Sequence, residues 1–282
     1  MTGERAVDLH THSSASDGLF PPRQLVREAH AVGLSAIGLT DHDTTAGLDD
    51  AEAEATSLGL FVVPGVELSA TDSGREAHTL GYFIDRDNEP FQVALRDFVT
   101  QRSERIDRMI ARLQELGVPI DRDAVLTRAG VGTVGRPHVA WELIEMGAAD
   151  DMVDAFDRYL GTGKPAYIPR PRLTPERAIE IIRSAGGAPV LAHPLSSPDP
   201  ETLIARLAQN GLVGMEVTYG EYDQEQRDRL RRIADANDLI PTGGSDFHAH
   251  NFKPGRDLGA TSVPWETIER LKTASDRIRS TR

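Results

Sequence analysis

The sequence has no cysteine, no long hydrophobic run and no excess of basic residues. Without cysteine there is no disulfide, no thiolate nucleophile and no cysteine-ligated zinc, so any metal must be held by His, Asp or Glu. No segment reaches the ~18 consecutive apolar residues of a membrane span, and no apolar signal run follows Met1. We therefore expect no membrane partner, and the missing disulfides fit a cytoplasmic location.

The charge balance restricts the ligands that the protein can bind. A total of 31 Lys and Arg residues against 44 Asp and Glu residues gives a net charge of −13. Non-specific binding to a long nucleic-acid duplex needs a basic surface, which argues against a duplex-coating role. A small or single-stranded phosphate ligand remains compatible, because divalent cations bound in one cleft would reverse the local field. The oligomeric state does not follow from the sequence.

Strand and helix patterns alternate along most of the 282 residues. Thr174-Pro175-Glu176 is typical of a helix start, with an N-cap residue, a proline at the first helical position and an early acid. The alternation predicts an α/β protein with parallel βαβ units, either a barrel or an open doubly wound sheet. The expected strands cover residues 6–10, 36–42, 60–69, 78–83, 188–193, 214–220 and 240–248, and the helices between them cover 21–33, 46–59, 174–187, 200–211 and 224–238.

Residues 86–170 interrupt this alternation. The pattern over 91–117 predicts one long amphipathic helix, and 121–130 and 136–147 predict shorter ones. We expect an all-helical cap subdomain inserted between the fourth and fifth strands. The expected domains are therefore 1–85 with 171–282, which form the α/β unit, and 86–170, which forms the cap.

The segment VDLHTHSSASDG, near the start of the chain, raises the first question about function. Side chains alternate along a strand, so His10 and His12 lie on the same face. Two imidazoles on one rigid edge make a good metal clamp. The alternative is a polar turn after an edge strand, with solvated histidines, and this segment by itself leaves both interpretations open.

Ionisable residues also gather at the ends of the other expected strands. In parallel β/α architectures the carboxyl ends of the strands form one rim, where active sites lie. Taken alone, a residue at such a position is more often structural than a metal ligand. Chance does not explain, however, why so many separate strands end in an ionisable residue. Mixed imidazole and carboxylate donors predict a site for two or three Zn, Mn or Fe ions. The residues are His10, His12, Asp17, Asp41, His42, Asp43, Glu67, His193, Asp246 and His248, with His78 as an exception at a strand start.

These segments resemble the PHP (polymerase and histidinol phosphatase) domain family, in matching order and spacing over nearly the whole chain. The resemblance implies a distorted, TIM-like (β/α)7 barrel with three metals at its rim. The matching segments are HTH at 10–12, TDHDT at 40–44, PGVELS at 64–69, AHP at 192–194 and SDFH at 245–248.

The resemblance also implies three ligand sets. Some family members, such as histidinol phosphatases, have His where this chain has Asp17, which weakens an assignment to histidinol phosphate. Asp41 and Asp43 are expected to orient ligands rather than to bind metal. The implied sets are His10, His12, Glu67 and Asp246 for one metal; Glu67, His78 and His193, with Glu67 bridging, for a second; and Asp17, His42 and His248 for a third.

A mechanism follows from two to three divalent ions held in this way. A metal-activated hydroxide would attack phosphorus in line, and the cations would neutralise the developing charge. The expected catalytic residues are Glu67, Asp246 and His193. The leaving alkoxide would take its proton from His193 or from a metal-bound water, and the sequence does not decide between them.

The cap contributes candidate phosphate contacts. The planar guanidinium of Arg136 and the point charge of Lys164 could both bind phosphate. Arg136 is equally well explained as a residue at a helix start, and Lys164 as a lysine on the surface. The segments around them look like those of the nucleotide-hydrolysing PHP branch, which implies that Arg136, His138 and Lys164 grip substrate phosphate. Arg170 and Arg172 are interpreted as solvated loop charges.

The resulting hypothesis is a metal-dependent phosphoesterase acting on nucleoside 3′,5′-bisphosphates or on the 5′ ends of short oligoribonucleotides. The alternatives are a phosphatase for 5′-mononucleotides or other small esters such as histidinol phosphate, a non-catalytic metal-binding PHP module, and a hydrolase of carbon–nitrogen bonds. No candidate carbamylated lysine follows the expected strands, which disfavours the last of these.

Overall fold

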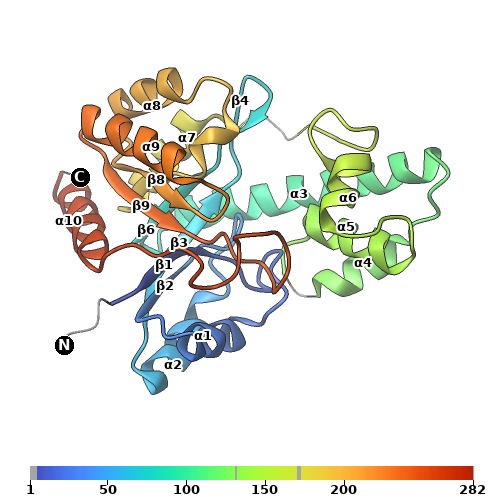
Figure 1. Ribbon diagram of the computed structural model, residues 1–282, viewed down its shortest axis with the longest axis horizontal. Helices are drawn as coiled ribbons and strands as arrows, with labels where there is room; N and C mark the ends of the chain where they lie inside the picture. The colour runs from blue at the N-terminus through green and yellow to red at the C-terminus, as the bar shows by residue number, and fades with distance from the viewer. Residues whose placement is uncertain (1–4, 131, 170–172, 282) are drawn as a thin grey trace.

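The computed structural model describes residues 5–130, 132–169 and 173–281, and a seven-stranded sheet forms its centre (Figure 1). Neighbouring strands follow the order β1-β2-β3-β6-β7-β8-β9. The bounds of these strands are β1 Val7–Thr11, β2 Ala36–Leu39, β3 Phe61–Leu68, β6 Thr79–Tyr82, β7 Ala188–Leu191, β8 Gly214–Tyr219 and β9 Ile240–Gly244.

The first and last strands lie side by side, so the sheet curls into a nearly closed barrel. The backbone N–H of Asp246 donates to the carbonyl of His10 at 2.9 Å, and that of His12 donates to the carbonyl of Phe247 at 2.9 Å. Of the two architectures that the alternation allowed, the barrel is the one observed. The segment after β9 therefore lies against the end of β1, which brings their polar side chains to the same rim.

Strand β6 is the exception to the predicted parallel sheet, because it runs antiparallel to both β3 and β7. A parallel crossover needs a dozen or more residues, whereas only residues 69–78 separate β3 from β6. This short connection forms a hairpin of two strands, β4 (Thr71–Asp72) and β5 (Arg75–Glu76). The reversal places His78, which precedes β6, at the rim where the other strands end.

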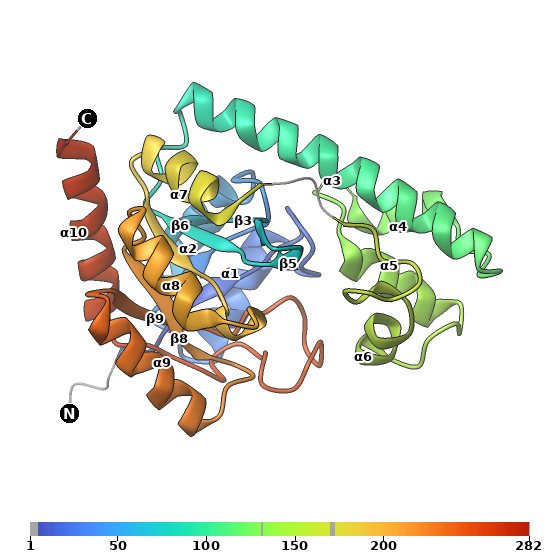
Figure 2. The same cartoon turned by 90° about the horizontal axis from the view of Figure 1, so that it is seen from above.

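Helices cover the outside of the barrel, as predicted. Helix α7 begins at Pro175 and is capped by Thr174, whose side chain accepts the N–H of Arg177. Helix α10 (Glu266–Ser280) was not predicted. It packs Ile268 and Leu271 on the barrel core, at the end opposite the polar rim (Figure 2). The other helices are α1 Pro22–Ala31, α2 Leu48–Leu58, α7 Pro175–Ser184, α8 Pro200–Gln209 and α9 Gln224–Ala236, with a 3-10 turn at Pro194–Ser196.

A helical unit lies between β6 and β7 in the chain and beyond the rim in space (Figure 2). Its apolar core also includes Ala249 and Phe252, from the segment after β9. Its long helix α3 (Glu89–Glu115) joins the two cores: Phe91 packs with the barrel side, and Met109 packs with the helical core. We propose that residues 86–170 form a cap subdomain on a barrel made of 1–85 and 171–282. The other elements of the cap are α4 Arg122–Ala129, α5 Arg136–Glu145, α6 Met152–Ala155 and a π-helix, η1, at Phe156–Leu160; the last two were not predicted.

Within the described residues, none of these helices combines the length and the hydropathy that crossing a bilayer requires.

A candidate metal centre at the barrel rim

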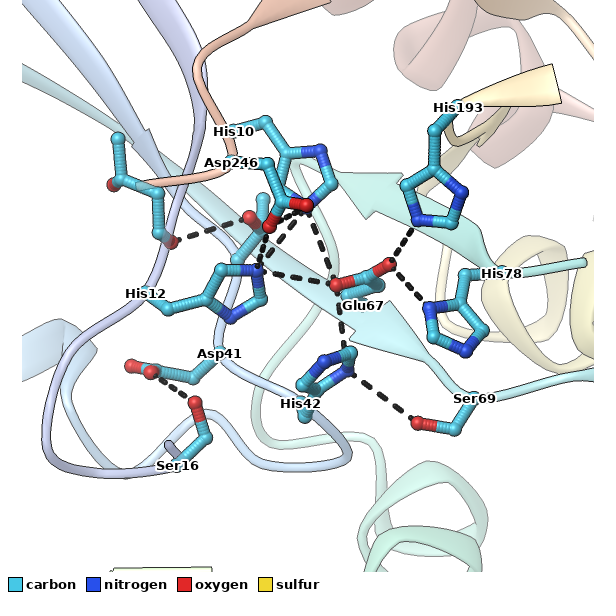
Figure 3. A network of polar contacts seen from close by, with 12 residues as sticks. His10, His12, Ser16, Asp41, His42, Glu67, Ser69, His78, His193 and Asp246 are labelled. Atoms are coloured by element: carbon cyan, nitrogen blue, oxygen red, sulfur yellow. Dashed lines mark hydrogen bonds and ion pairs between the residues drawn. The ribbon is translucent and has the colours of Figure 1, made fainter. Parts of the chain in front are cut away.

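Glu67, near the end of β3, lies at the centre of a buried cluster of histidines (Figure 3). Its two carboxylate oxygens face different parts of the cluster. Oε2 lies 3.2 Å from His10 Nε2, 3.2 Å from His12 Nε2 and 3.3 Å from His42 Nδ1. Oε1 lies 2.8 Å from His78 Nδ1 and 3.3 Å from His193 Nε2. One carboxylate thus reaches five imidazoles that come from four segments of the chain, since His10 and His12 share one.

One set of four donor atoms has the spacing that a metal ion requires. The ligand atoms of a tetrahedral ion, bound at ~2.0–2.2 Å, lie roughly 3.3–3.6 Å from one another. The five separations known among His10 Nε2, His12 Nε2, Glu67 Oε2 and Asp246 Oδ1 range from 3.1 to 3.5 Å. Two ring nitrogens 3.1 Å apart need a proton or a cation between them. The donor set therefore fits a divalent metal.

Two further groups of donors share residues with this set. His42, Glu67 and His78 form one group, and His12, Asp17, His42 and His248 form the other. His42 stands within reach of both groups, whereas the resemblance implied only the second. His193 approaches Glu67 but belongs to neither group. All nine residues implied as ligands are nevertheless brought to one rim.

The charges in this cluster stabilise one another. Burial by itself would raise the pKa of Glu67, but the adjacent imidazoles of His42 and His10 lower it well below its usual range. The pKa of Asp246 is likewise lowered despite burial, chiefly by the guanidinium of Arg256, whose Nη1 lies 2.8 Å from Oδ2. Both carboxylates are therefore ionised at neutral pH, as metal ligands must be.

The backbone is strained at two of these residues. His193 has φ of 27° and Asp246 has φ of 55°, in the left-handed region that side chains other than glycine seldom adopt. Such conformations cost of order 1 kcal/mol or more and gather at functional sites, where the surrounding structure holds them. In each case the turn directs a polar side chain into the cluster immediately after its strand.

Glu216 was not identified from the sequence, although it is fully buried beside the cluster. Its Oε1 accepts the Nδ1–H of His10 at 2.9 Å, and its Oε2 accepts the backbone N–H of His193 at 2.6 Å. A single charged residue inside the largely apolar strand 214–219 was the signal that could have revealed it.

Arg102, on α3, is the second residue that the sequence did not reveal. Its buried guanidinium lies 2.5 Å from Asp17 Oδ2 and 3.3 Å from Asp43 Oδ2, and its Nε–H donates to the carbonyl of Val134. The helical unit thereby holds two acids of the barrel rim. Nothing in the amphipathic pattern of α3 distinguishes this arginine from a solvated one.

Asp41 and Asp43 contact backbone and polar neighbours at the rim. Asp41 accepts the N–H and the hydroxyl of Ser13 at 2.8 and 2.6 Å, and the hydroxyl of Ser16 at 2.6 Å. Asp43 accepts the N–H of Ser69 at 3.0 Å. The loop that leads to Asp17 is therefore tied to the end of β2.

The start of α5 also approaches the cluster closely. A Cβ at Gly135 would lie 2.7 Å from Asp17 Oδ2 and 2.6 Å from Arg102 Nη2, so a larger residue here would have to displace this ion pair. The Nδ1 of buried His138 accepts the N–H of Gly135 at 2.9 Å and closes the first turn of the helix. His138 thus has a structural contact in addition to the substrate contact implied for it.

A cavity of about 520 Å³ lies between the rim and the helical unit and includes part of the cluster in its wall. Arg136, Lys253 and Arg256 bring positive charge to it, while Phe156 and Tyr222 supply aromatic surface. The exposed side chain of Lys164, by contrast, is not among those that line this cavity. Arg170 and Arg172 lie outside the described residues.

Comparisons with known proteins agree with this geometry. Residues 8–96 match the PHP domain. Over 251 residues the chain is 38% identical to a 5′-3′ exoribonuclease of Salmonella typhimurium, covering 86% of this chain and 84% of that protein. Over 260 residues it is 34% identical to a 3′,5′-nucleoside bisphosphate phosphatase of Chromobacterium violaceum, covering 90% of this chain and 91% of that protein.

The fold is shared as well. A crystal structure from Bifidobacterium adolescentis, described as a candidate metal-dependent phosphoesterase, superposes with a TM-score of 0.87 at 34% identity, covering 95% of this chain and 96% of that one. The similarity extends through the helical unit as well as the barrel, since it spans nearly the whole length of both chains. The chain therefore belongs to the PHP domain family.

Proposed function

We propose that this protein is a metal-dependent phosphoesterase that acts on nucleotides, with nucleoside 3′,5′-bisphosphates and the 5′ ends of short oligoribonucleotides as its preferred substrates. The observation that carries the proposal is the buried donor cluster around Glu67, which borders a cavity that arginine and lysine side chains also line. Candidate metal donors and cationic side chains therefore face one space. The relatives that act on RNA and on nucleoside bisphosphates support the same substrate class.

The proposed centre holds two to three Mn, Fe or Zn ions, because its donors are imidazoles and carboxylates. When bound, such ions supply an activated water and neutralise charge on the phosphate. The sets are the ones that the family resemblance implies. They are His10, His12, Glu67 and Asp246; Glu67, His78 and His193; and Asp17, His42 and His248.

Catalytic roles are proposed for Glu67, Asp246 and His193. Glu67 places negative charge where two donor groups meet. Asp246 belongs to one of them and keeps Oδ1 toward the imidazoles because Tyr219 and Arg256 occupy its Oδ2. The side chain of His193 is 15% exposed, more than that of any other imidazole around Glu67. It is therefore the imidazole best placed to exchange a proton with the leaving oxygen.

The shape and charge of the cavity support a small phosphorylated substrate. Its volume of about 520 Å³ falls within the ~300–1,000 Å³ that small-molecule sites occupy. Arg136, which lines the cavity beyond the metal donors, is proposed to bind a second phosphate. His138 and Lys164 are proposed as further contacts on the family resemblance alone, because neither side chain lines the cavity. A net charge of −13 disfavours long duplexes.

A comparison of kcat/KM among substrates tests the proposal. The panel consists of adenosine 3′,5′-bisphosphate, AMP, histidinol phosphate, a short 5′-phosphorylated RNA and a set of amides. We expect the bisphosphate or the RNA to be best and the amides to be inert. A tenfold preference for histidinol phosphate would overturn the substrate assignment, and the absence of turnover with every ester in metal-loaded protein would favour a non-catalytic module.

A further inference from the structure

An ion pair joins the barrel to the helical unit at the wall of the cavity. Arg136 Nη2, on α5, lies 2.6 Å from Glu76 Oε1, on β5, and both residues line the cavity wall. Their side chains are 12% and 20% exposed, so the pair is largely shielded from water. Figure 2 shows that β5, on the barrel, and α5, in the helical unit, face each other.

Arg136 is held by more than its carboxylate partner. Its guanidinium carbon lies 5.3 Å from the ring centre of Phe156, and the ammonium of Lys253 lies 5.8 Å from the same centre. A cation within about 6 Å of an aromatic face is attracted to it. The guanidinium would therefore stay at the cavity wall if the Glu76 carboxylate moved away, beside a second cation.

Glu76 belongs to a part of the chain that has other anchors. The Ser196 hydroxyl donates to the Glu76 carbonyl at 3.2 Å, and Asp72, on the paired strand β4, accepts from Arg206 at 2.6 Å. Neither contact involves the side chain of Arg136 or of Glu76. The Glu76 side chain can therefore change its partner without release of the hairpin.

We propose that Glu76 is a specificity-determining residue that stands in for the second phosphate of a substrate. With a substrate that carries one phosphate, Glu76 stays on Arg136 and prevents the cost of an unpaired, largely buried cation. A substrate with a second phosphate displaces the carboxylate and takes its place between Arg136 and Lys253. This inference rests on the proposed function and adds to it a residue that sets the preference between substrates with and without a second phosphate.

The consequence is that Glu76 should affect the binding of one substrate and not of the other. A second phosphate must compete with Glu76, whereas a mononucleotide leaves the pair intact. Removal of the Glu76 charge should therefore favour the bisphosphate selectively. Loss of a pair of this kind changes binding by about fivefold, if the pair contributes ~1 kcal/mol.

The experiment compares kcat/KM for adenosine 3′,5′-bisphosphate and AMP in wild-type protein and in the Glu76→Gln variant. Glutamine keeps the size and one acceptor oxygen but loses the charge. We expect the ratio of bisphosphate to AMP to rise about fivefold, mainly through a lower KM for the bisphosphate. Asp72→Asn is the matched control, since it removes a charged pair of the same hairpin outside the cavity, and its ratio should equal that of wild type.

Several outcomes would overturn the inference. An unchanged ratio would mean that Glu76 does not compete with the second phosphate, and a higher KM for both substrates would mean that it only positions Arg136. An equal gain for both would point to a general electrostatic effect of the cavity. Wild-type protein that hydrolyses neither substrate would instead refute the proposed function, so the two failures are distinguishable. Thermal unfolding of each variant verifies that it is folded.

Discussion

Glu216, on β8, orients His10, on β1, through a hydrogen bond across the barrel. The carboxylate on β8 accepts the Nδ1–H of His10 at 2.9 Å, which turns Nε2 of that imidazole toward Glu67 and Asp246. Its other oxygen accepts the backbone N–H of His193 at 2.6 Å. One buried acid thus orients a ring on β1 and the turn after β7. Partners of this kind fix the tautomer of a metal-binding imidazole and raise its basicity.

Glu216→Gln should weaken metal binding without loss of any donor atom. Loss of the carboxylate partner of a ligating histidine typically costs 10–100-fold in metal affinity. Titration of metal-free protein with Mn²⁺ or Zn²⁺ in a calorimeter would measure this change. Glu225→Gln, at an exposed position on α9, is the control and should bind as wild type does. Equal affinities in the two variants would show that Glu216 does not support the centre.

Glu67→Ala should remove the group that links the donor sets. We expect turnover to fall by several orders of magnitude and the bound metal to decrease, because five imidazoles lose their shared carboxylate. Circular dichroism should show an intact barrel, since a rim residue adds little to the apolar core. A folded Glu67→Ala protein with a rate near that of wild type would exclude the bridging role.

The metal content of the purified protein is a direct test of the centre. After expression in metal-supplemented medium, elemental analysis should find two to three equivalents of transition metal per chain. A chelator should abolish hydrolysis, and added Mn²⁺ should restore it. Less than one equivalent would argue strongly against a centre with several metals.

Arg136→Ala should weaken the binding of a nucleoside bisphosphate while the metal content stays unchanged. A charge-assisted contact contributes about 1.5–3 kcal/mol, so we expect KM to rise roughly 10- to 100-fold. Steady-state kinetics with adenosine 3′,5′-bisphosphate would measure this. If kcat/KM stays within twofold of wild type, Arg136 is only the first residue of α5.

His138 should make the stability of the metal-free protein dependent on pH. Burial lowers the pKa of His138 from 6.5 to about 4. As the pH falls, His138 therefore binds a proton in the unfolded chain before it does so in the folded protein. The free energy of unfolding decreases between about pH 6.5 and pH 4. Between pH 7 and pH 5 this amounts to about 2 kcal/mol.

The His138→Gln variant tests this assignment. Glutamine at the third helical position can accept the N–H of Gly135, as His138 does, but it does not titrate. Urea unfolding of the metal-free proteins gives the free energy of unfolding at pH 7 and at pH 5. Its decrease between these two pH values should be about 2 kcal/mol smaller in the variant than in wild type. Equal losses in both proteins would mean that His138 is protonated in the folded state.

Most of the donor cluster could be predicted from the sequence by itself. His10 and His12 share a strand face, and Glu67, His193 and Asp246 end apolar runs, so local patterns placed them at one rim before any contact was known. The alternation also predicted most of the helices and strands, because hydrophobic periodicity reflects which face of each element is buried.

Only the tertiary structure decided which side chains meet. It reverses β6, which brings His78 to the rim, and it places Glu216, Arg102 and Glu76 against His10, Asp17 and Arg136. These pairs join residues far apart in the chain. Hydrophobic periodicity indicates which face of one element is buried. It does not indicate that an acid or arginine is buried against a charged partner on another element. The donors could therefore be read from the sequence, whereas the residues that hold them depend on contacts between distant elements.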